Sequence, residues 1–232
     1  MKKKCTAIVL AAGKGSRMGT KVHKQYLELQ GRPVLYYSLK VFEDSDIIDD
    51  IILVTGKGEV EYCRNSIVAY YHLTKVRNIV EGGKERYESV YNALCAIPGD
   101  GEGYVFIHDG ARPFVNSGMI ERSYETVEKY KACVVGMPVK DTIKIVDEEQ
   151  YAKLTPDRKS LWQVQTPQVF DKRLIREAYS LMMKSGDTDI TDDAMVVERY
   201  MNQRVKMIEG SYRNLKITTP EDLEIAEIFA AK

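Results

Sequence analysis

The stretch Cys5-Thr-Ala-Ile-Val-Leu10-Ala-Ala-Gly13-Lys-Gly-Ser-Arg-Met-Gly19 determines the predicted fold. Its first six residues form a short, nearly continuous apolar run, which is typical of a strand covered on both faces. The run leads directly into glycines, where the backbone N–H groups can approach a ligand closely. The stretch therefore predicts a buried strand with a binding turn at its carboxyl end.

Similar apolar runs recur along the chain at residues 51–55, 76–80, 104–108 and 132–139. Amphipathic stretches with helical spacing lie between them, around Leu39, Leu94 and Val127. Strands that alternate with helices imply an α/β fold, with a mainly parallel, Rossmann-like sheet and helices on both faces. Binding sites in such sheets lie outside the carboxyl ends of the strands.

The alternation breaks after Val139. Residues 140–160 are mostly polar, and residues 142–146 are expected to form a strand that leads through the turn 147–150 into a return strand. Because so many residues without a helix are unusual inside a compact domain, we predict an extended β-arm at about residues 139–161. Such an arm often meets a partner subunit.

Regular elements return in the last third of the chain. Helical periodicity covers residues 174–183 and 192–200, and a strand is expected at residues 205–209. Thr219 and Pro220 are the N-cap and first residue of a final helix. There is no internal repeat or low-complexity linker, so we predict one domain over residues 1–232 with one arm.

The composition is that of an ordinary globular protein of 232 residues, with 44% hydrophobic and 29% charged residues. This argues against disordered, collagen-like and coiled-coil classes. The 34 basic residues balance the 34 acidic ones, so no net field attracts nucleic acid or a membrane surface. An anionic ligand must therefore meet a local cluster of cations.

The four cysteines stand at wide, irregular spacings and the three histidines are scattered, which indicates neither a zinc site nor a redox motif. We expect four separate buried thiols. The apolar run after the Lys-rich start is too short for a signal peptide, and no segment approaches the roughly 18 apolar residues of a membrane span. We therefore expect the cytoplasm as the compartment, without membrane or nucleic-acid partners.

The Gly-rich turn is the strongest candidate site. The backbone of Gly13 and Gly15 can form a nest for anionic oxygens, and Lys14 and Arg17 add positive charge. It is no Walker A loop, because Ile8 stands where that motif has its first glycine, and it lacks the third glycine of the dinucleotide fingerprint. It is interpreted as a phosphate-binding loop, the alternative being a simple strand-to-helix connection.

Three further positions extend this candidate site. Lys24 is close enough along the chain to fold back over the loop, unless it is only a solvated surface charge. The turn Gly82-Gly83 precedes an expected helix over residues 89–97, whose N-terminus is either a ligand site or a plain cap. Asp109 and Arg112 follow a buried strand, where a carboxylate can hold Mg²⁺ on a nucleotide or form a structural ion pair.

Taken together, these segments resemble one family, the 2-C-methyl-D-erythritol 4-phosphate cytidylyltransferases, over nearly the whole chain from Ala7 to about Ala226. Eight motifs keep the family's order, which makes coincidence implausible. They are Ala11-Ala-Gly-Lys-Gly-Ser-Arg17-Met, Lys24-Gln-Tyr, Gly82-Gly-x-x-Arg86-x-x-Ser89-Val, His108-Asp-Gly-Ala-Arg112-Pro, Pro138-Val-Lys-Asp-Thr142, Leu161-Trp162 with Gln165-Thr-Pro-Gln168, Thr191-Asp-Asp, and Lys216-Ile-Thr-Thr-Pro-Glu-Asp-Leu223.

The resemblance implies an enzyme that transfers CMP from CTP to methylerythritol phosphate and releases pyrophosphate, with Mg²⁺ as cofactor and a homodimer built through the β-arm. It implies catalytic roles for Arg17, Lys24 and Lys216. It also implies two sets of binding residues. The nucleotide would be held by Ala11, Ala12, Gly13, Lys14, Gly15, Ser16, Gly83, Lys84, Ser89, Asp109 and Gly110, with Asp109 beside the metal, and the acceptor by Arg112, Thr142, Arg158, Thr166 and Thr191.

Three alternatives stay open at this point. A ribitol-5-phosphate cytidylyltransferase shares the nucleotide loop, although Asp157-Arg158 with Asp141-Thr142 looks more like the methylerythritol enzymes. A nucleotide-binding regulatory module without turnover is disfavoured by Arg17, Lys24 and Lys216. An NAD-dependent oxidoreductase is disfavoured by the incomplete glycine fingerprint.

Overall fold

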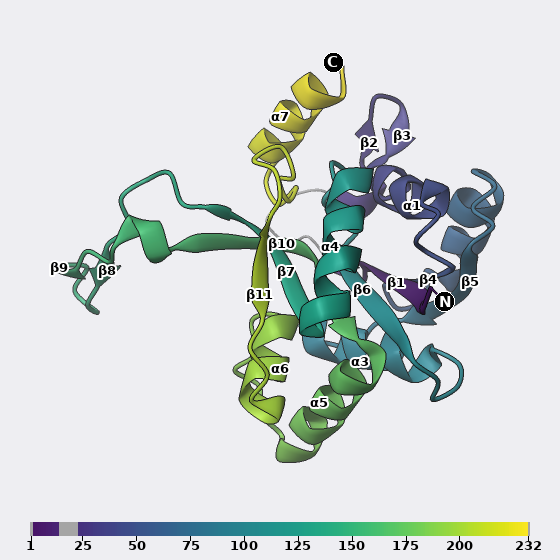
Figure 1. The fold of residues 1–232 in the computed structure, drawn as a ribbon. Coiled ribbons are helices and arrows are strands. Elements are labelled where there is room, and N and C mark those ends of the chain that lie inside the picture. Colours follow the sequence, from purple (N-terminus) through teal and green to yellow (C-terminus); the bar gives the residue numbers. More distant parts are fainter. Residues whose placement is uncertain (1, 14–22, 232) are drawn as a thin grey trace.

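Seven strands form one sheet in the order β11-β7-β10-β6-β1-β4-β5 (Figure 1). The computed structural model describes residues 2–13 and 23–231. β10 runs antiparallel to β6 and β7, and the remaining neighbours are parallel, so the predicted mainly parallel α/β fold is confirmed. In chain order the strands are β1 Lys4–Ala11, β4 Asp50–Thr55, β5 Val76–Glu81, β6 Gly103–Asp109, β7 Ala132–Pro138, β10 Trp162–Asp171 and β11 Lys206–Glu209.

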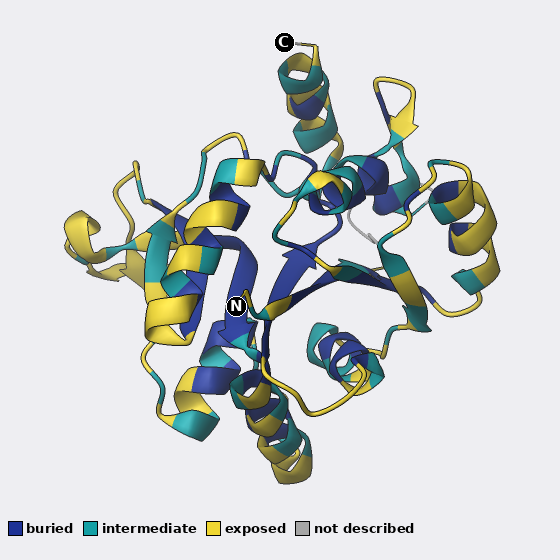
Figure 2. Ribbon diagram, turned by 45° about the vertical axis from the view of Figure 1, so that its right-hand side comes forward, coloured by how far each residue is buried: buried dark blue, intermediate teal, exposed yellow. Residues whose placement is uncertain are grey.

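Helices cover both faces of this sheet. They are α1 Val34–Asp44, α2 Val60–Tyr62, η3 Cys63–Ala69, α3 Arg86–Ala96, α4 Ser117–Tyr130, α5 Lys172–Ser185 and α6 Asp193–Met201. The last helix, α7 Pro220–Ala230, packs beside Leu29 and Val34, away from the sheet. Successive residues of a strand point to opposite faces, so Val9 belongs to the core under α1, η3 and α4, and Ile8 to the core under α3, α5 and α6. Figure 2 shows the sheet buried between helices whose outer surfaces are exposed.

β10 was not expected from the sequence. The middle of β10 carries the buried polar side chains of Gln165, Thr166 and Gln168. These residues interrupt the apolar run by which a buried strand is recognised in a sequence. They are tolerated because they are hydrogen-bonded; for example, Gln165 Nε2 donates to the Ser211 carbonyl at 2.8 Å. The helical segment of α2 and η3 and the small hairpin of β2 Glu28–Leu29 and β3 Arg32–Pro33 were also not expected.

The predicted arm leaves the body between β7 and β10 and projects away from the sheet (Figure 1). Its tip contains β8 Ile145–Val146 and β9 Ala152–Leu154, which pair antiparallel, followed by the short helix η4 Arg158–Ser160. The return strand is confirmed, but the first strand covers only two residues of the expected 142–146. Ile145 and Leu154 are about half exposed, so the arm presents apolar side chains to its surroundings.

The remaining elements agree with the sequence in most respects. The final helix begins after Thr219 with Pro220 in its first turn, as predicted. The expectation of four buried thiols is wrong at Cys95, because α3 turns Leu94 into the core and the neighbouring Cys95 toward solvent. Among the described residues, no helix is long and apolar enough to cross a membrane.

Candidate active site

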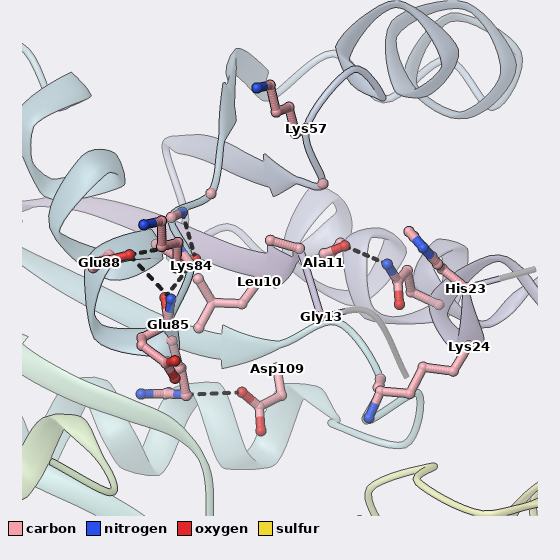
Figure 3. Close-up of a pocket in the computed structure, with 18 of the residues that line it drawn as sticks. Leu10, Ala11, Gly13, His23, Lys24, Lys57, Lys84, Glu85, Glu88 and Asp109 are labelled. Atoms are coloured by element: carbon pink, nitrogen blue, oxygen red, sulfur yellow. Dashed lines mark hydrogen bonds and ion pairs between the residues drawn. The ribbon is translucent and has the colours of Figure 1, made fainter. Parts of the chain in front are cut away.

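A cavity of about 830 Å³ lies where the carboxyl ends of β1, β4, β5 and β6 meet, at the edge of the sheet expected to bind ligands. Its volume is in the range of small-molecule sites. Residues 11–13 form the wall after β1, Gly56 and Lys57 the wall after β4, and residues 82–89 the wall after β5. In Figure 3, Lys84, Glu85 and Glu88 lie on one side of the cavity and His23 and Lys24 on the other.

Positive charge dominates the described lining. Five cationic side chains and three carboxylates face the cavity, a local excess of cations in a chain whose net charge is zero. The cations are Lys24, Lys57, Lys84, Arg86 and Lys216, and the carboxylates are Glu85, Glu88 and Asp109. The local cluster that an anionic ligand requires is therefore present.

Asp109 ends β6 and is almost entirely buried among three cations. Lys216 Nζ lies 2.8 Å from its Oδ2, Arg112 Nε 3.7 Å from the same oxygen, and Arg86 Nε 3.4 Å from its Oδ1. Burial works against ionisation, but the three positive charges hold the pKa of Asp109 well below its ordinary value. The carboxylate is therefore charged, and it fixes the three cations at the cavity.

A buried chain of hydrogen bonds holds the backbone of Asp109 on the side facing the protein interior. Burial lowers the pKa of His108 to about 4, so its ring is neutral. The Arg112 carbonyl can only accept, so His108 Nε2 donates to it at 3.1 Å and Nδ1 is an acceptor. The Thr166 hydroxyl then donates to Nδ1 at 2.9 Å and accepts the Asp109 N–H at 3.1 Å. The hydroxyl of Thr166 thus positions Asp109 from inside the protein.

Arg86 connects the cavity to helix α6. Its two terminal nitrogens lie 2.9 and 2.7 Å from the two oxygens of Asp193, which is fully buried. The Tyr179 hydroxyl donates to Asp193 Oδ1 at 2.5 Å. This bidentate pair fixes the guanidinium, so that its Nε is directed at Asp109.

The turn before α3 is held by two side chains of that helix. Glu88 Oε2 accepts from the backbone N–H of Lys84 at 2.5 Å and of Glu85 at 3.1 Å. The hydroxyl of Ser89 accepts from the Gly83 N–H at 3.1 Å. These three amides are already paired within the protein, so they are not free to donate to a ligand. The turn forms a rigid wall instead.

Lys24 lines the opposite wall on a single helical turn, η2 Lys24–Tyr26. The neighbouring Gln25 is 2% exposed and donates through Nε2 to the carbonyl of Ala11 at 2.5 Å. The end of β1 and the Lys24 segment are thus tied together. The structure places Lys24 at the cavity, as the sequence motif suggested.

A second, smaller cavity of about 280 Å³ adjoins the first at Lys216, which lines both. Arg112, Gln163 and Tyr212 contribute further polar groups. Asn214 also lines it, and its Oδ1 is buried with no hydrogen-bond partner among the described residues. Such an oxygen can accept a hydrogen bond from a ligand hydroxyl.

The structure brings together nine of the residues that the sequence proposed. Ala11, Ala12, Gly13, Lys24, Gly83, Lys84, Ser89, Asp109 and Lys216 all line the large cavity. Lys14, Gly15, Ser16 and Arg17 lie outside the described residues. Gly110 does not line the cavity: its N–H donates to the Leu10 carbonyl, and a Cβ there would lie 2.9 Å from that oxygen.

The proposed acceptor residues are spread more widely. Arg112 lines the small cavity and Thr166 is buried behind Asp109. Thr142, Arg158 and Thr191 are exposed and, within the part of the chain that is described, line neither cavity. Arg158 donates to the Lys140 carbonyl at 2.8 Å across the base of the arm.

The sequence patterns predict no role for several residues of the site. Asp193 was quoted only within the motif Thr191-Asp-Asp, and Glu88 carried no signal of its own, because both meet their partners only after folding. Arg86 stood within a recognised motif, and its position three residues before Ser89 on one helix could have indicated a place at the cavity. His108 directly precedes Asp109 and was quoted only as part of a motif.

The donor set fits Mg²⁺ bound mainly by a nucleotide. Mg²⁺ in such sites takes one or two carboxylates together with phosphate oxygens and water, and Asp109 supplies a carboxylate at the cavity. The described residues contain no group of three or more His, Cys, Asp or Glu side chains that could hold a metal ion. The cations around Asp109 also oppose a metal that arrives without phosphate.

Comparison with known proteins identifies the family. A family model described as 2-C-methyl-D-erythritol 4-phosphate cytidylyltransferase matches residues 5–232. The chain belongs to this family. The cytidylyltransferase of Lachnospira eligens is 55% identical over 225 residues, which cover 97% of this chain and 98% of the relative. That of Caldanaerobacter subterraneus is 47% identical over 227 residues, covering 98% and 99%.

A solved structure shows the same family fold. The 4-diphosphocytidyl-2C-methyl-D-erythritol synthase of Anaerococcus prevotii matches with a TM-score of 0.88 and 35% identity, covering 100% of this chain and 97% of that one. The corresponding cytidylyltransferase of Francisella tularensis gives a TM-score of 0.82 at 30% identity, covering 97% and 99%. The comparisons do not favour the ribitol-phosphate alternative.

Proposed function

We propose that the protein transfers CMP from CTP to 2-C-methyl-D-erythritol 4-phosphate, giving 4-diphosphocytidyl-2-C-methyl-D-erythritol and pyrophosphate in isoprenoid precursor biosynthesis. The single observation that carries the proposal is family membership over residues 5–232. The cation-rich cavity at the carboxyl ends of the parallel strands supports it, because a triphosphate requires such a cluster.

The chemistry is a phosphoryl substitution. An oxygen of the acceptor phosphate attacks the α-phosphorus of CTP, the new P–O bond forms, and the bond from that phosphorus to the bridging oxygen breaks, so that pyrophosphate leaves with the electron pair. The attacking oxygen is already anionic near neutral pH, so catalysis consists of positioning and charge neutralisation. We assign that work to Lys24 and Lys216, with Arg17 added from the family motif.

The junction of the two cavities is the proposed place of reaction. Lys216 lines both, so its ammonium group can neutralise the α-phosphate and the acceptor phosphate together. The large cavity then holds CTP, and the small polar cavity receives the alditol. Arg112 and the unpartnered Asn214 Oδ1 give the small cavity a cation for phosphate and an acceptor for a hydroxyl.

Cytosine is proposed to bind against the turn at Gly83. The amides of Gly83 and Lys84 donate within the protein, so the backbone carbonyls of this turn are the groups that would accept from the 4-amino group of cytosine. Uracil has a carbonyl at that position, which cannot donate. CTP should therefore be used far better than UTP, ATP or GTP.

Mg²⁺ is the proposed cofactor, held by the triphosphate with Asp109 as a protein ligand. When bound, it neutralises phosphate charge and makes pyrophosphate a better leaving group. Asp109 would share its carboxylate between the ion and Lys216, which keeps the lysine beside the reacting phosphates.

A homodimer built through the arm is part of the proposal. The arm carries exposed apolar side chains, including Ile145 and Leu154, and a second copy would bury them. Thr142 and Arg158 line neither cavity of their own chain, which favours a role in the partner's acceptor pocket. One domain with one arm over residues 1–232, and a cytoplasmic location, stay predictions.

A turnover assay tests the proposed function. Purified protein with Mg²⁺ should release pyrophosphate from CTP with methylerythritol phosphate, much more slowly from UTP or ATP, and poorly with ribitol 5-phosphate. Faster turnover with ribitol 5-phosphate would shift the assignment to the alternative acceptor. Absence of pyrophosphate with every acceptor would overturn it.

A further inference from the structure

Glu59 lies in the turn after β4, outside every motif that the sequence offered. It stands at the start of α2, yet its side chain does not cap that helix. Its Oε2 accepts hydrogen bonds from the Tyr26 hydroxyl at 2.8 Å and from the Gly56 N–H at 3.0 Å. Its Oε1 lies 2.7 Å from His23 Nδ1. One carboxylate thus joins two walls of the cavity.

The segment that Glu59 contacts is the one that carries Lys24. His23 and Tyr26 flank Lys24 and both reach Glu59, while Gln25 is anchored to the carbonyl of Ala11. His23, Gln25 and Tyr26 are therefore tied to neighbouring elements, and Lys24, which lies among them, lines the cavity.

The groups around Glu59 are suited to holding its carboxylate in one position. Burial, with the neighbouring Cys63 and Glu59, raises the pKa of Tyr26 far above its ordinary value, so the phenol stays protonated and donates. Its oxygen also lies 3.1 Å from Cys63 Sγ. Gly56 packs so closely that a Cβ there would lie 2.6 Å from Glu59 Oε2. The carboxylate thus lies directly against the Gly56 backbone.

We infer that Glu59 is a positioning residue that holds Lys24 in place for phosphate neutralisation, through Tyr26 and His23. The inference rests on the proposed function for its kinetic consequence. A displacement of about 1 Å in a positioned group can lower a rate about 10²-fold, so a support that does not touch substrate can still control kcat.

The test compares Glu59→Ala with Glu61→Ala, a neighbouring carboxylate on the same helical segment that is 73% exposed and pairs with Arg64. Glu59→Ala should lower kcat roughly 10- to 100-fold and change the KM for CTP by less than about threefold. Glu59→Gln, which keeps an oxygen for the Tyr26 hydroxyl, should recover most of kcat. Glu61→Ala should match the wild type.

A double-mutant cycle decides whether the effect passes through Lys24. In a Lys24→Ala background, Glu59→Ala should lower kcat by less than about threefold further, because the supported group is gone. The same fold-loss in both backgrounds, or an unchanged kcat in a folded Glu59→Ala protein, would overturn the inference. If Glu59→Ala does not fold, Tyr26→Phe removes the hydroxyl alone and the same comparison applies.

A second readout needs no turnover and separates this inference from the proposed function. Amide hydrogen exchange at residues 24–27 should be faster in Glu59→Ala than in Glu61→Ala, without any substrate. A wild-type protein that lacks turnover would overturn the proposed function alone. Equal exchange in the two variants would overturn the positioning role whatever the enzyme turns over.

Discussion

Lys216 Nζ and Asp109 Oδ2 lie 2.8 Å apart at the junction of the two cavities. Arg86 and Arg112 complete the set of cations around the same carboxylate. An acidic side chain at the end of a parallel strand is a natural metal ligand, yet here it is surrounded by positive charge. The arrangement suits a site whose metal arrives with its phosphates.

Metal binding should therefore depend on nucleotide. Mn²⁺, used as a spectroscopic substitute for Mg²⁺, should show little binding to the protein alone and clear binding when CTP is present. Electron paramagnetic resonance of free Mn²⁺ measures this directly. Strong binding of Mn²⁺ without CTP would show that the cations around Asp109 do not control the site.

Removal of the Lys24 ammonium group should act mainly on kcat. Lys24→Ala should lower kcat roughly 10²- to 10³-fold, the scale for loss of one positioned donor to developing charge. Steady-state kinetics with CTP varied at saturating acceptor checks this, with Lys129→Ala, on the outer helix α4, as a matched control. A Lys24→Ala enzyme with wild-type kcat would exclude the role.

The sequence predicts elements that a local residue pattern defines. It does not predict contacts between residues that lie far apart in the chain. β1 could be predicted because a buried strand needs a continuous apolar run. β10 could not, since Gln165 and Gln168 are polar and become acceptable in the core only after folding supplies their partners. The pairing of Arg86 with Asp193 spans 107 residues and no local pattern encodes it. Thr166 was proposed for the acceptor, but its hydroxyl is used by His108 and Asp109.

The neutral His108 ring should make stability depend on pH. Its pKa is lowered from 6.5 to about 4 by burial, so the unfolded chain binds the proton first as pH falls. The contribution is fully present above about pH 6.5 and is lost as pH falls toward 4, at most about 3 kcal/mol for one such group.

Urea unfolding between pH 7 and pH 4.5 measures this contribution. His108→Gln keeps a donor for the Arg112 carbonyl and an acceptor for Thr166 but does not titrate, so its unfolding free energy should fall less over this range than that of the wild type. Identical slopes for the two proteins would show that His108 is not the group responsible.

Breaking the pair between Arg86 and Asp193 should destabilise the fold. Asp193→Asn removes the charge that compensates Arg86 and weakens the acceptor of the Tyr179 hydroxyl. We expect a loss of roughly 2–3 kcal/mol, below the usual range for a fully buried pair because the Arg86 side chain is 29% exposed. Asp44→Asn, at an exposed ion pair on α1, should change the unfolding free energy little.

The arm should act in trans. If Arg158 serves the acceptor site of the partner, Lys24→Ala and Arg158→Ala proteins should restore activity when mixed, because one site of the heterodimer carries both lesions and the other carries neither. Up to about half of the wild-type activity per heterodimer should return. Subunits that exchange, as shown by mass spectrometry, without recovery of activity would place Arg158 in its own chain's site.

The central claim is that an oxygen of the acceptor phosphate attacks the α-phosphorus of CTP. Isotope labelling tests this claim most directly. Methylerythritol phosphate labelled with ¹⁸O at its non-bridging phosphate oxygens is turned over with unlabelled CTP. Mass spectrometry then measures the ¹⁸O content of both products. The account predicts that the cytidine diphosphate alditol retains all of the label and that pyrophosphate carries none. Label in the inorganic product, or an unlabelled nucleotide product, would contradict it.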